Sequence, residues 1–300
     1  MTDSVITTAG TPALENIEIH EETISAFAAM PNPWRPSPAR VYDALLGGKD
    51  NYAPDKLLAR ELALRVPSAA CAAVENRRFL ERAVRFLAGD AGVGQFIDVG
   101  CGLPPPSQHR PVHQIAQGVR PGSRVVYVDN DPLVVVHARA LMGTDPDTTA
   151  VVAADLRDPQ SFLNHPATRR LIDFRRPVAV LCTAMLHCLP GDQAARAMAT
   201  LQAELPPGSY IALSHLVDLP GLAEAVAIYR RRTGTGAPRS REQIAALFGD
   251  GELVDPGLVP PPCWRPEPPS GKAVSTSSWD VGAGGRGSVT TNQHPLLAGV

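Results

Sequence analysis

The chain has 300 residues, and 44% of them are hydrophobic, which is enough to bury a substantial core. Its 28 basic and 30 acidic residues leave a formal charge of -2, so no nucleic-acid partner is expected. The five cysteines form no C-x-x-C pair, which argues against a disulfide framework or a zinc knuckle and fits a reducing compartment. The sequence shows no signal peptide and no apolar run long enough to span a bilayer, so we expect a cytoplasmic protein without a membrane partner.

The first third of the chain is expected to be helical after a loose start. Residues 1–35 lack clear periodicity and are predicted to be a disordered extension. A helical pattern begins at Ala39 and ends at Gly47-Gly48, where glycine favours a helix C-terminus. Two more helices are predicted over about 54–65 and 68–88, because apolar residues recur there at helical spacing.

Short β-rich segments follow, separated by intervals long enough for crossover helices. Most of them are continuous apolar runs, as expected for strands covered on both faces. The predicted strands are residues 95–99, 124–129, 150–153, 178–183, 209–214 and 252–254. This alternation predicts an α/β fold with a parallel sheet.

Two local signals mark the end of this region. Ser240 and Gln243 form a capping box that predicts the start of a late helix. After Trp264 the chain becomes rich in Pro, Gly, Ser and Thr, and we predict a disordered tail over residues 269–300.

The first predicted strand ends in an Asp-x-Gly-x-Gly motif. Asp98, Gly100 and Gly102 are its members, and glycines here allow a tight turn and close approach of a ligand to the backbone. The dinucleotide fingerprint requires a third glycine, but Pro105 occupies that place, which disfavours NAD. S-adenosylmethionine (SAM) has no pyrophosphate and needs that glycine less. A glycine turn without a ligand is the simpler alternative for this motif alone.

Acidic residues end the next two strands. Asp129, followed by Asn130, can accept hydrogen bonds from ribose hydroxyls, while Asp131 before Pro132 is suited to cap the next helix. Asp155, followed by Leu156, can accept a hydrogen bond from an adenine amino group, although an Asp after a strand is commonly a turn residue. Acids at three successive strand ends favour a SAM site, because ligands of open α/β sheets bind at the carboxyl ends of the strands.

The fourth predicted strand leads into Thr183 and His187. Thr183 is a candidate cofactor contact, and His187 is a candidate general base, although such a histidine is more often structural. No metal site is predicted, because His109 and His113 have Pro111 between them and no third ligand is evident.

Several of these segments resemble a known family. They include Arg40 to Tyr52, Asn76 to Leu80, Phe96 to Pro104, Val126 to Pro132 and Glu252 to Val259. They are similar to the actinobacterial SAM-dependent methyltransferases first catalogued as a domain of unknown function. The similarity extends over roughly residues 36–268.

The resemblance implies a Rossmann-like class I methyltransferase with a mostly parallel seven-stranded sheet, helices on both faces and an N-terminal helical cap. Residues 36–90 would be the cap and residues 91–268 the SAM-binding domain. The chain departs from the family at Cys101, where threonine is usual, and at Trp279 to Gly287, which only faintly resembles the family's last apolar strand.

The segment from Tyr42 to Tyr52 is expected to close over the methionine end of SAM. Backbone N–H groups of Gly47 and Gly48, together with Lys49, would face the carboxylate, and Asp43 or Asp50 would face the ammonium. A helix end with solvated turn residues is the alternative.

Two functions are compatible with these features. The first is methyl transfer from SAM to a small-molecule acceptor, with His187 or Tyr42 assisting deprotonation. The second is a non-enzymatic SAM-binding regulator. A nicotinamide oxidoreductase ranks below both because of Pro105.

Overall fold

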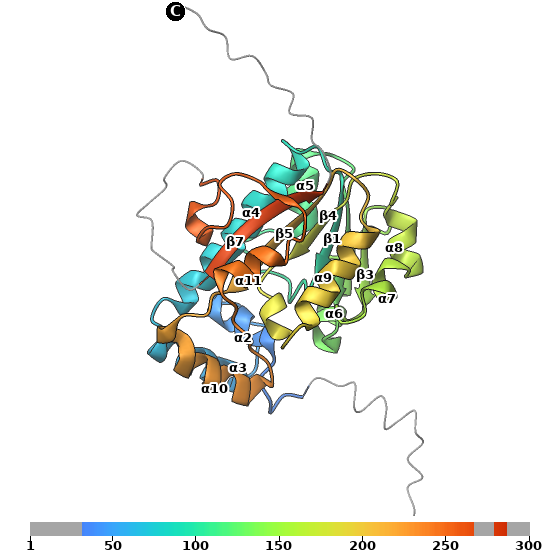
Figure 1. Ribbon diagram of the computed structural model, residues 1–300. Helices are drawn as coiled ribbons and strands as arrows, with labels where there is room; N and C mark the ends of the chain where they lie inside the picture. Colours follow the sequence, from blue (N-terminus) through green and yellow to red (C-terminus); the bar gives the residue numbers. More distant parts are fainter. Residues whose placement is uncertain (1–31, 267–278, 287–300) are drawn as a thin grey trace, which may run out of the picture. The chain divides into compact units, whose positions relative to one another are not determined.

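The computed structural model describes residues 32–266 and 279–286, and these residues form an α/β sandwich around a seven-stranded sheet (Figure 1). The strands lie in the order β3-β2-β1-β4-β5-β7-β6. Their bounds are Gln95–Val99 (β1), Arg124–Asp129 (β2), Thr149–Ala153 (β3), Ala179–Cys182 (β4), Ser209–Leu216 (β5), Glu252–Leu253 (β6) and Trp279–Arg286 (β7). Strands β1 to β5 pair in parallel, whereas β7 is antiparallel to both of its neighbours. The predicted α/β fold and parallel sheet are thus confirmed.

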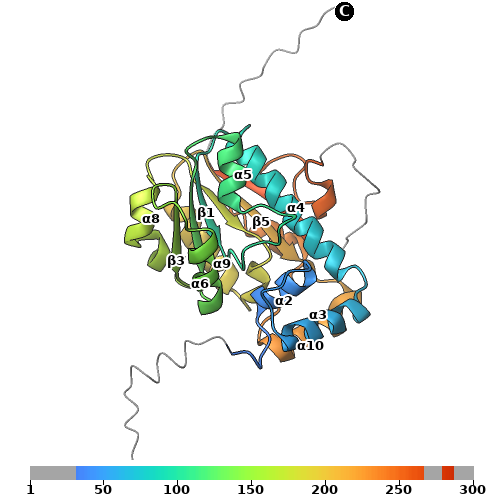
Figure 2. The ribbon, with the colours of Figure 1, turned by 180° about the vertical axis from the view of Figure 1, so that it is seen from behind.

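Helices cover both faces of the sheet (Figures 1 and 2). On one face α4 (Ala69–Ala88), α5 (Val112–Val119) and part of α6 (Pro132–Leu141) pack around strand residues such as Phe96. On the other face α7 (Pro159–Leu163), α8 (Pro166–Leu171), α9 (Gln193–Glu204) and α11 (Arg241–Ala246) pack around residues such as Ile97. Adjacent residues of a strand point to opposite faces, so a strand buried on both sides must be apolar throughout.

A helical cap lies beyond the carboxyl ends of the strands. It consists of α2 (Pro38–Leu45), α3 (Ala53–Arg65) and α10 (Ala223–Thr233), which lie side by side in both views. Val41, Leu58 and Ile228 belong to its own apolar core, one from each helix. The sequence predicted a cap made of residues 36–90. The structure adds α10, which follows β5 in the chain, and α4 packs on the sheet as well.

A buried ion pair fixes the geometry of the cap. Arg40 on α2 donates to the Asp55 carboxylate on α3 at 2.8 Å, and both side chains are almost fully buried. A buried pair of this kind is costly to break because the remaining charge would be uncompensated. The pair thus holds α2 against α3.

Helix ends follow the local signals in the sequence. Asp131 caps α6 by accepting a hydrogen bond from the Leu133 N–H at 2.9 Å, and Ser240 with Gln243 forms the predicted capping box of α11. After α2 the chain turns at Gly47, whose φ is +78°. Within the described residues, no helix is long and apolar enough to cross a membrane.

The prediction of a disordered tail is wrong for Trp279–Arg286, which forms β7 between β5 and β6. Glycine is disfavoured in strands, and this strand contains three glycines, so its composition hid it. The structure gives two of them a reason: a Cβ at Gly284 would lie 2.8 Å from the Phe248 ring, and one at Gly285 would lie 3.1 Å from the Tyr210 ring. The predicted disorder of residues 1–31, 269–278 and 287–300 falls outside the described residues.

Candidate functional site

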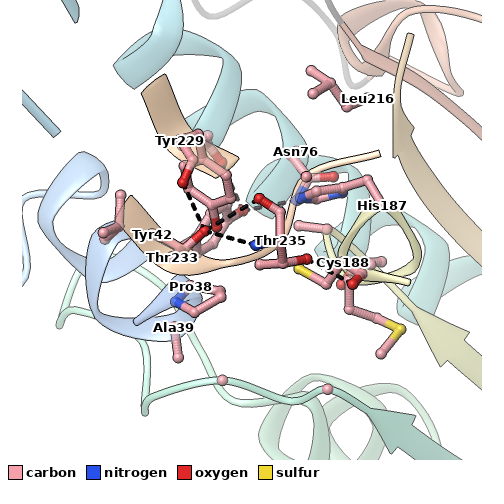
Figure 3. A pocket seen from close by; sticks show the side chains of 18 of the residues that line it. Pro38, Ala39, Tyr42, Asn76, His187, Cys188, Leu216, Tyr229, Thr233 and Thr235 are labelled. Atoms are coloured by element: carbon pink, nitrogen blue, oxygen red, sulfur yellow. Dashed lines mark hydrogen bonds between the residues drawn. The ribbon is translucent and has the colours of Figure 1, made fainter. Parts of the chain in front are cut away.

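A cavity of about 650 Å³ lies between the carboxyl ends of the strands and the cap. This volume is within the range of about 300–1,000 Å³ that is usual for small-molecule sites. Its walls come from the β1–α5 loop, the ends of β2, β3 and β4, and helices α2, α4 and α10. Figure 3 shows a group of its side chains near the cap, including Tyr42, Asn76, His187 and Tyr229.

The glycine loop after β1 forms the floor of the cavity. Gly100 and Gly102 both line it and have φ values of +68° and +67°, a region that favours glycine. A Cβ at Gly100 would also approach the Met185 side chain to 2.8 Å. Asp98 does not line the cavity, and burial raises the pKa of its carboxyl to about 7. Asp98 therefore lies beneath the loop and is not placed to contact a ligand in the cavity.

Asp129 holds the glycine loop and also lines the cavity. Its carboxylate accepts hydrogen bonds from the Gly102 N–H at 3.0 Å and from the Asp131 N–H at 2.9 Å. Burial raises the pKa of this carboxyl to about 6, against the opposing effect of the two backbone donors. The second strand end thus places a carboxyl that is mainly ionised at neutral pH beside the loop.

The third strand end is already hydrogen-bonded within the protein. Asp155 accepts from the Asn130 amide at 2.8 Å and from the Arg157 guanidinium, and the hydrogen bond from Arg157 lowers its pKa to about 2. Asn130, Asp155 and Leu156 all line the cavity, as does Thr183 after β4. These four predicted residues therefore line one cavity. Asp155 is ionised at neutral pH because its pKa is lowered.

The cap segment contributes only some of the residues expected of it. Tyr42 and Asp43 line the cavity, whereas Gly47, Gly48 and Lys49 do not. A Cβ at Gly48 would overlap the Asp43 carboxylate, so this glycine serves to admit that carboxylate. Asp43 also accepts hydrogen bonds from the Asn51 amide at 2.6 Å and from the Asp50 N–H at 3.0 Å. The loop therefore positions Asp43, not Lys49, at the cavity.

Sequence reasoning missed Arg77 as a site residue. Arg77 lies on α4, lines the cavity and is 7% exposed, yet its Nε has no hydrogen-bond partner among the described residues. Its charge opposes the rise in the pKa of Asp98. The signal was a polar pair, Asn76 and Arg77, within an apolar helical stripe that includes Ala73 and Leu80. A buried cation with an unused donor is suited to bind an anion.

His187 and Tyr42, the two predicted general bases, differ in their hydrogen bonds within the protein. The Tyr42 hydroxyl donates to the Ala73 carbonyl at 3.1 Å and accepts from the Asn76 amide at 2.8 Å, and burial raises its pKa. Tyr42 therefore stays protonated and is a poor base. His187 is buried, and its Nδ1 has no hydrogen-bond partner among the described residues.

The surroundings of His187 keep it neutral. Its ring lies edge-on to those of His215 and Trp279, at centroid distances of 5.9 Å and 5.2 Å. Burial, together with His215 and Arg239, lowers the pKa of His187 to about 3. A base that binds protons this weakly gives little general-base catalysis, but a neutral imidazole can accept a hydrogen bond.

The described part of the chain contains no cluster of His, Cys, Asp and Glu that could hold a metal ion. Cys101 and Cys188 line the cavity, and Cys182 is buried at the end of β4. Burial raises the pKa of each thiol. These cysteines are therefore protonated at neutral pH and are not activated nucleophiles.

The comparisons agree with this architecture. Residues 31–288 match the model of a family described as S-adenosyl methyltransferase, and the chain belongs to that family. A Thermobifida fusca YX protein to which methyltransferase activity is attributed is 45% identical, with a TM-score of 0.79 over 85% of this chain and 96% of that one. A DUF574 family protein from Streptomyces avermitilis is 33% identical, with a TM-score of 0.79 over 84% and 98% of the two chains. None of the curated proteins matches the sequence.

The chain is thus a SAM-dependent methyltransferase of class I, Rossmann-like architecture. The residues of the cavity fit the cofactor that the family implies. The buried Arg77, whose Nε has no partner among the described residues, and the Asp43 carboxylate supply opposite charges for a zwitterion. The glycine floor admits a ligand against the backbone.

Proposed function

We propose that the enzyme methylates a small-molecule acceptor that is enclosed between the strand ends and the cap. The observation that carries this proposal is the single cavity that continues from the glycine loop to α10. SAM supplies an activated methyl group on a sulfonium sulfur. The protein then has to align an acceptor with that methyl group and exclude water.

Residues at the strand ends would hold the adenosine part. Asp129 accepts hydrogen bonds from ribose hydroxyls, while Asn130, Asp155 and Leu156 form the wall for the adenine. Gly100, Gly102 and Thr183 border the same region. At the other end, Arg77 binds the carboxylate and Asp43 binds the ammonium group.

His187 would hold the acceptor. Its neutral imidazole accepts a hydrogen bond from the acceptor group and orients it, and Tyr42 with Asn76 forms the adjacent wall. We assign His187 an orienting role because its lowered pKa makes it a weak base.

The pKa of Asp129 predicts how cofactor binding depends on pH. An acid with a raised pKa of about 6 is mainly ionised at pH 7.5 and mainly protonated at pH 5. If the ionised form binds ribose, S-adenosylhomocysteine (SAH) should bind roughly tenfold more weakly at pH 5 than at pH 7.5. Calorimetric titrations at both values measure this, and Asp129→Asn should bind weakly with little pH dependence. A wild-type affinity that is equal at pH 5 and pH 7.5 would remove Asp129 from the proposed site.

The acceptor class can be tested with methyl-labelled SAM. The enzyme is incubated with labelled SAM and a lysate of an actinobacterium, and the products are separated by mass. We expect the label in the low-mass organic fraction. Label that is confined to protein or nucleic acid would contradict a small-molecule acceptor.

A further inference from the structure

The charged and neutral walls of the cavity are separated. Its charged residues are Asp43, Arg77, Asp129, Asp131, Asp155 and Arg157, and they come from α2, α4 and the ends of β2 and β3. The part of the lining that comes from α3, the start of α4 and α10 has no charged residue. This neutral wall includes Leu62, Val66, Ala69, Leu222, Ala225 and Val226. A charged acceptor in this region would lose its hydration without gaining a counter-ion.

Most polar groups near this neutral wall already form hydrogen bonds within the protein. Thr233 donates its hydroxyl to the Tyr229 carbonyl at 2.9 Å, and Thr235 donates to the Cys188 carbonyl at 2.6 Å (Figure 3). The Tyr42 hydroxyl is held by Ala73 and Asn76.

Besides Nε of Arg77, two buried polar atoms of cavity-lining residues have no hydrogen-bond partner among the described residues. They are Nδ1 of His187 and Oδ1 of Asn76, and both residues are more than nine-tenths buried. Both are uncharged at neutral pH. A buried polar atom without a partner is costly, and a hydroxyl donor on a ligand would satisfy one of them.

We propose that the neutral wall selects an uncharged aromatic acceptor whose phenolic hydroxyl donates to His187. This inference rests on the proposed function and specifies its substrate class. An alkyl alcohol would need a strong base, whereas a phenol, with a pKa near 10, loses its proton far more easily. The cap helices place no carboxylate at the cavity other than Asp43, which is hydrogen-bonded to Asn51 and Asp50.

The reaction balances without any further reactant. The phenol oxygen forms a bond to the methyl carbon as the carbon–sulfur bond breaks, and the electron pair of that bond stays on sulfur. The products are an aryl methyl ether and SAH. As the oxygen–carbon bond forms, the phenolic oxygen becomes strongly acidic, and its proton leaves along the His187 hydrogen bond to the solvent.

The test measures the binding of three naphthalene probes to the enzyme saturated with SAH. The probes are 2-naphthol, the 2-naphthoate anion and the 2-naphthylmethylammonium cation. We expect 2-naphthol to bind at least roughly tenfold more tightly than either ion, because burial of an unpaired charge is the larger cost. Labelled SAM with 2-naphthol should then yield labelled 2-methoxynaphthalene.

A charged helix variant supplies the matched comparison. Val226 lines the cavity and is half-buried, whereas its neighbour Ala227 is exposed and does not line it. Val226→Glu should weaken 2-naphthol by roughly tenfold and favour the cation, while Ala227→Glu should change neither. SAH should bind both variants as it binds the wild type, which also reports that they are folded.

The outcomes separate the two proposals. Equal or tighter binding of an ion to the wild-type enzyme, or binding of SAH with none of the three probes, overturns the phenol inference and leaves the proposed function intact. Failure of SAH itself to bind overturns both. The wild-type measurement decides the matter even if Val226→Glu does not fold.

Discussion

Replacing Arg77 with methionine is expected to weaken the binding of SAM and SAH by about 2–3 kcal/mol, the usual cost of losing hydrogen bonds to a charged partner. The reason is that Arg77 is a buried cation at the cavity with an unused Nε donor. Methionine keeps much of the side-chain volume and fills the helix stripe, so the loss is mainly one of charge and donors. Isothermal titration calorimetry of the folded variant measures the effect.

Three controls make this result specific. Arg78→Met changes the exposed neighbour, whose side chain is 58% exposed, and should leave affinity unchanged. 5′-Methylthioadenosine lacks the carboxylate, so its binding should be nearly insensitive to Arg77→Met. Lys49→Ala should have little effect on SAH, because Lys49 does not line the cavity. A larger loss of affinity for Lys49→Ala than for Arg77→Met would mean that Lys49 binds the carboxylate, as the sequence suggested. It would contradict the assignment of that contact to Arg77.

Truncation after residue 278 is expected to abolish cooperative folding. It removes β7, which pairs with β5 over eight residue positions and also carries β6. The truncated chain would expose the edge of β5 and lose the buried side chains of Val281 and Ala283. Asp280 would leave its ion pair with Arg241, in which the two side chains are 2.9 Å apart. A typical stability of only about 5–15 kcal/mol leaves little to offset the loss of a whole strand from the sheet.

A point variant isolates the contribution of the strand itself. Ala283 is fully buried, and Ala283→Asp should lower the free energy of unfolding by about 3–5 kcal/mol, because it buries a carboxylate without a partner. Leu253→Asp on the adjacent β6 places the same group at a position that is 38% exposed and should cost less than about 1 kcal/mol. Chemical denaturation measures both values. Equal stability of the wild type and Ala283→Asp would mean that β7 is dispensable.

The strands that the sequence predicted well are the apolar ones. Strands β1 and β2 begin and end where expected, because a continuous apolar run bounded by turn residues has few other interpretations. β7 was missed because its glycines are required by side chains far away in the sequence, namely Phe248 and Tyr210. No local pattern could reveal that requirement.

The residues of the candidate site also divide into those that the sequence could predict and those that it could not. Gly100, Gly102, Asp129 and Asp155 follow strands, and the parallel sheet alone brings strand ends together. Lys49 and Arg77 could not be ranked from the sequence, since the choice depends on the direction in which the loop after α2 turns. Gly48 packs against Asp43, which leaves Lys49 outside the cavity wall, while α4 brings Arg77 to it.

A calorimetric titration of the purified enzyme with SAH, and then with NAD, at pH 7.5 tests whether the cavity is a SAM site. We expect one SAH site per chain, no binding of NAD, and loss of the SAH signal in Asp129→Ala, because this carboxylate lies at the cavity and holds the glycine loop. Tight binding of NAD, or SAH binding that is unchanged in a folded Asp129→Ala variant, would contradict this expectation.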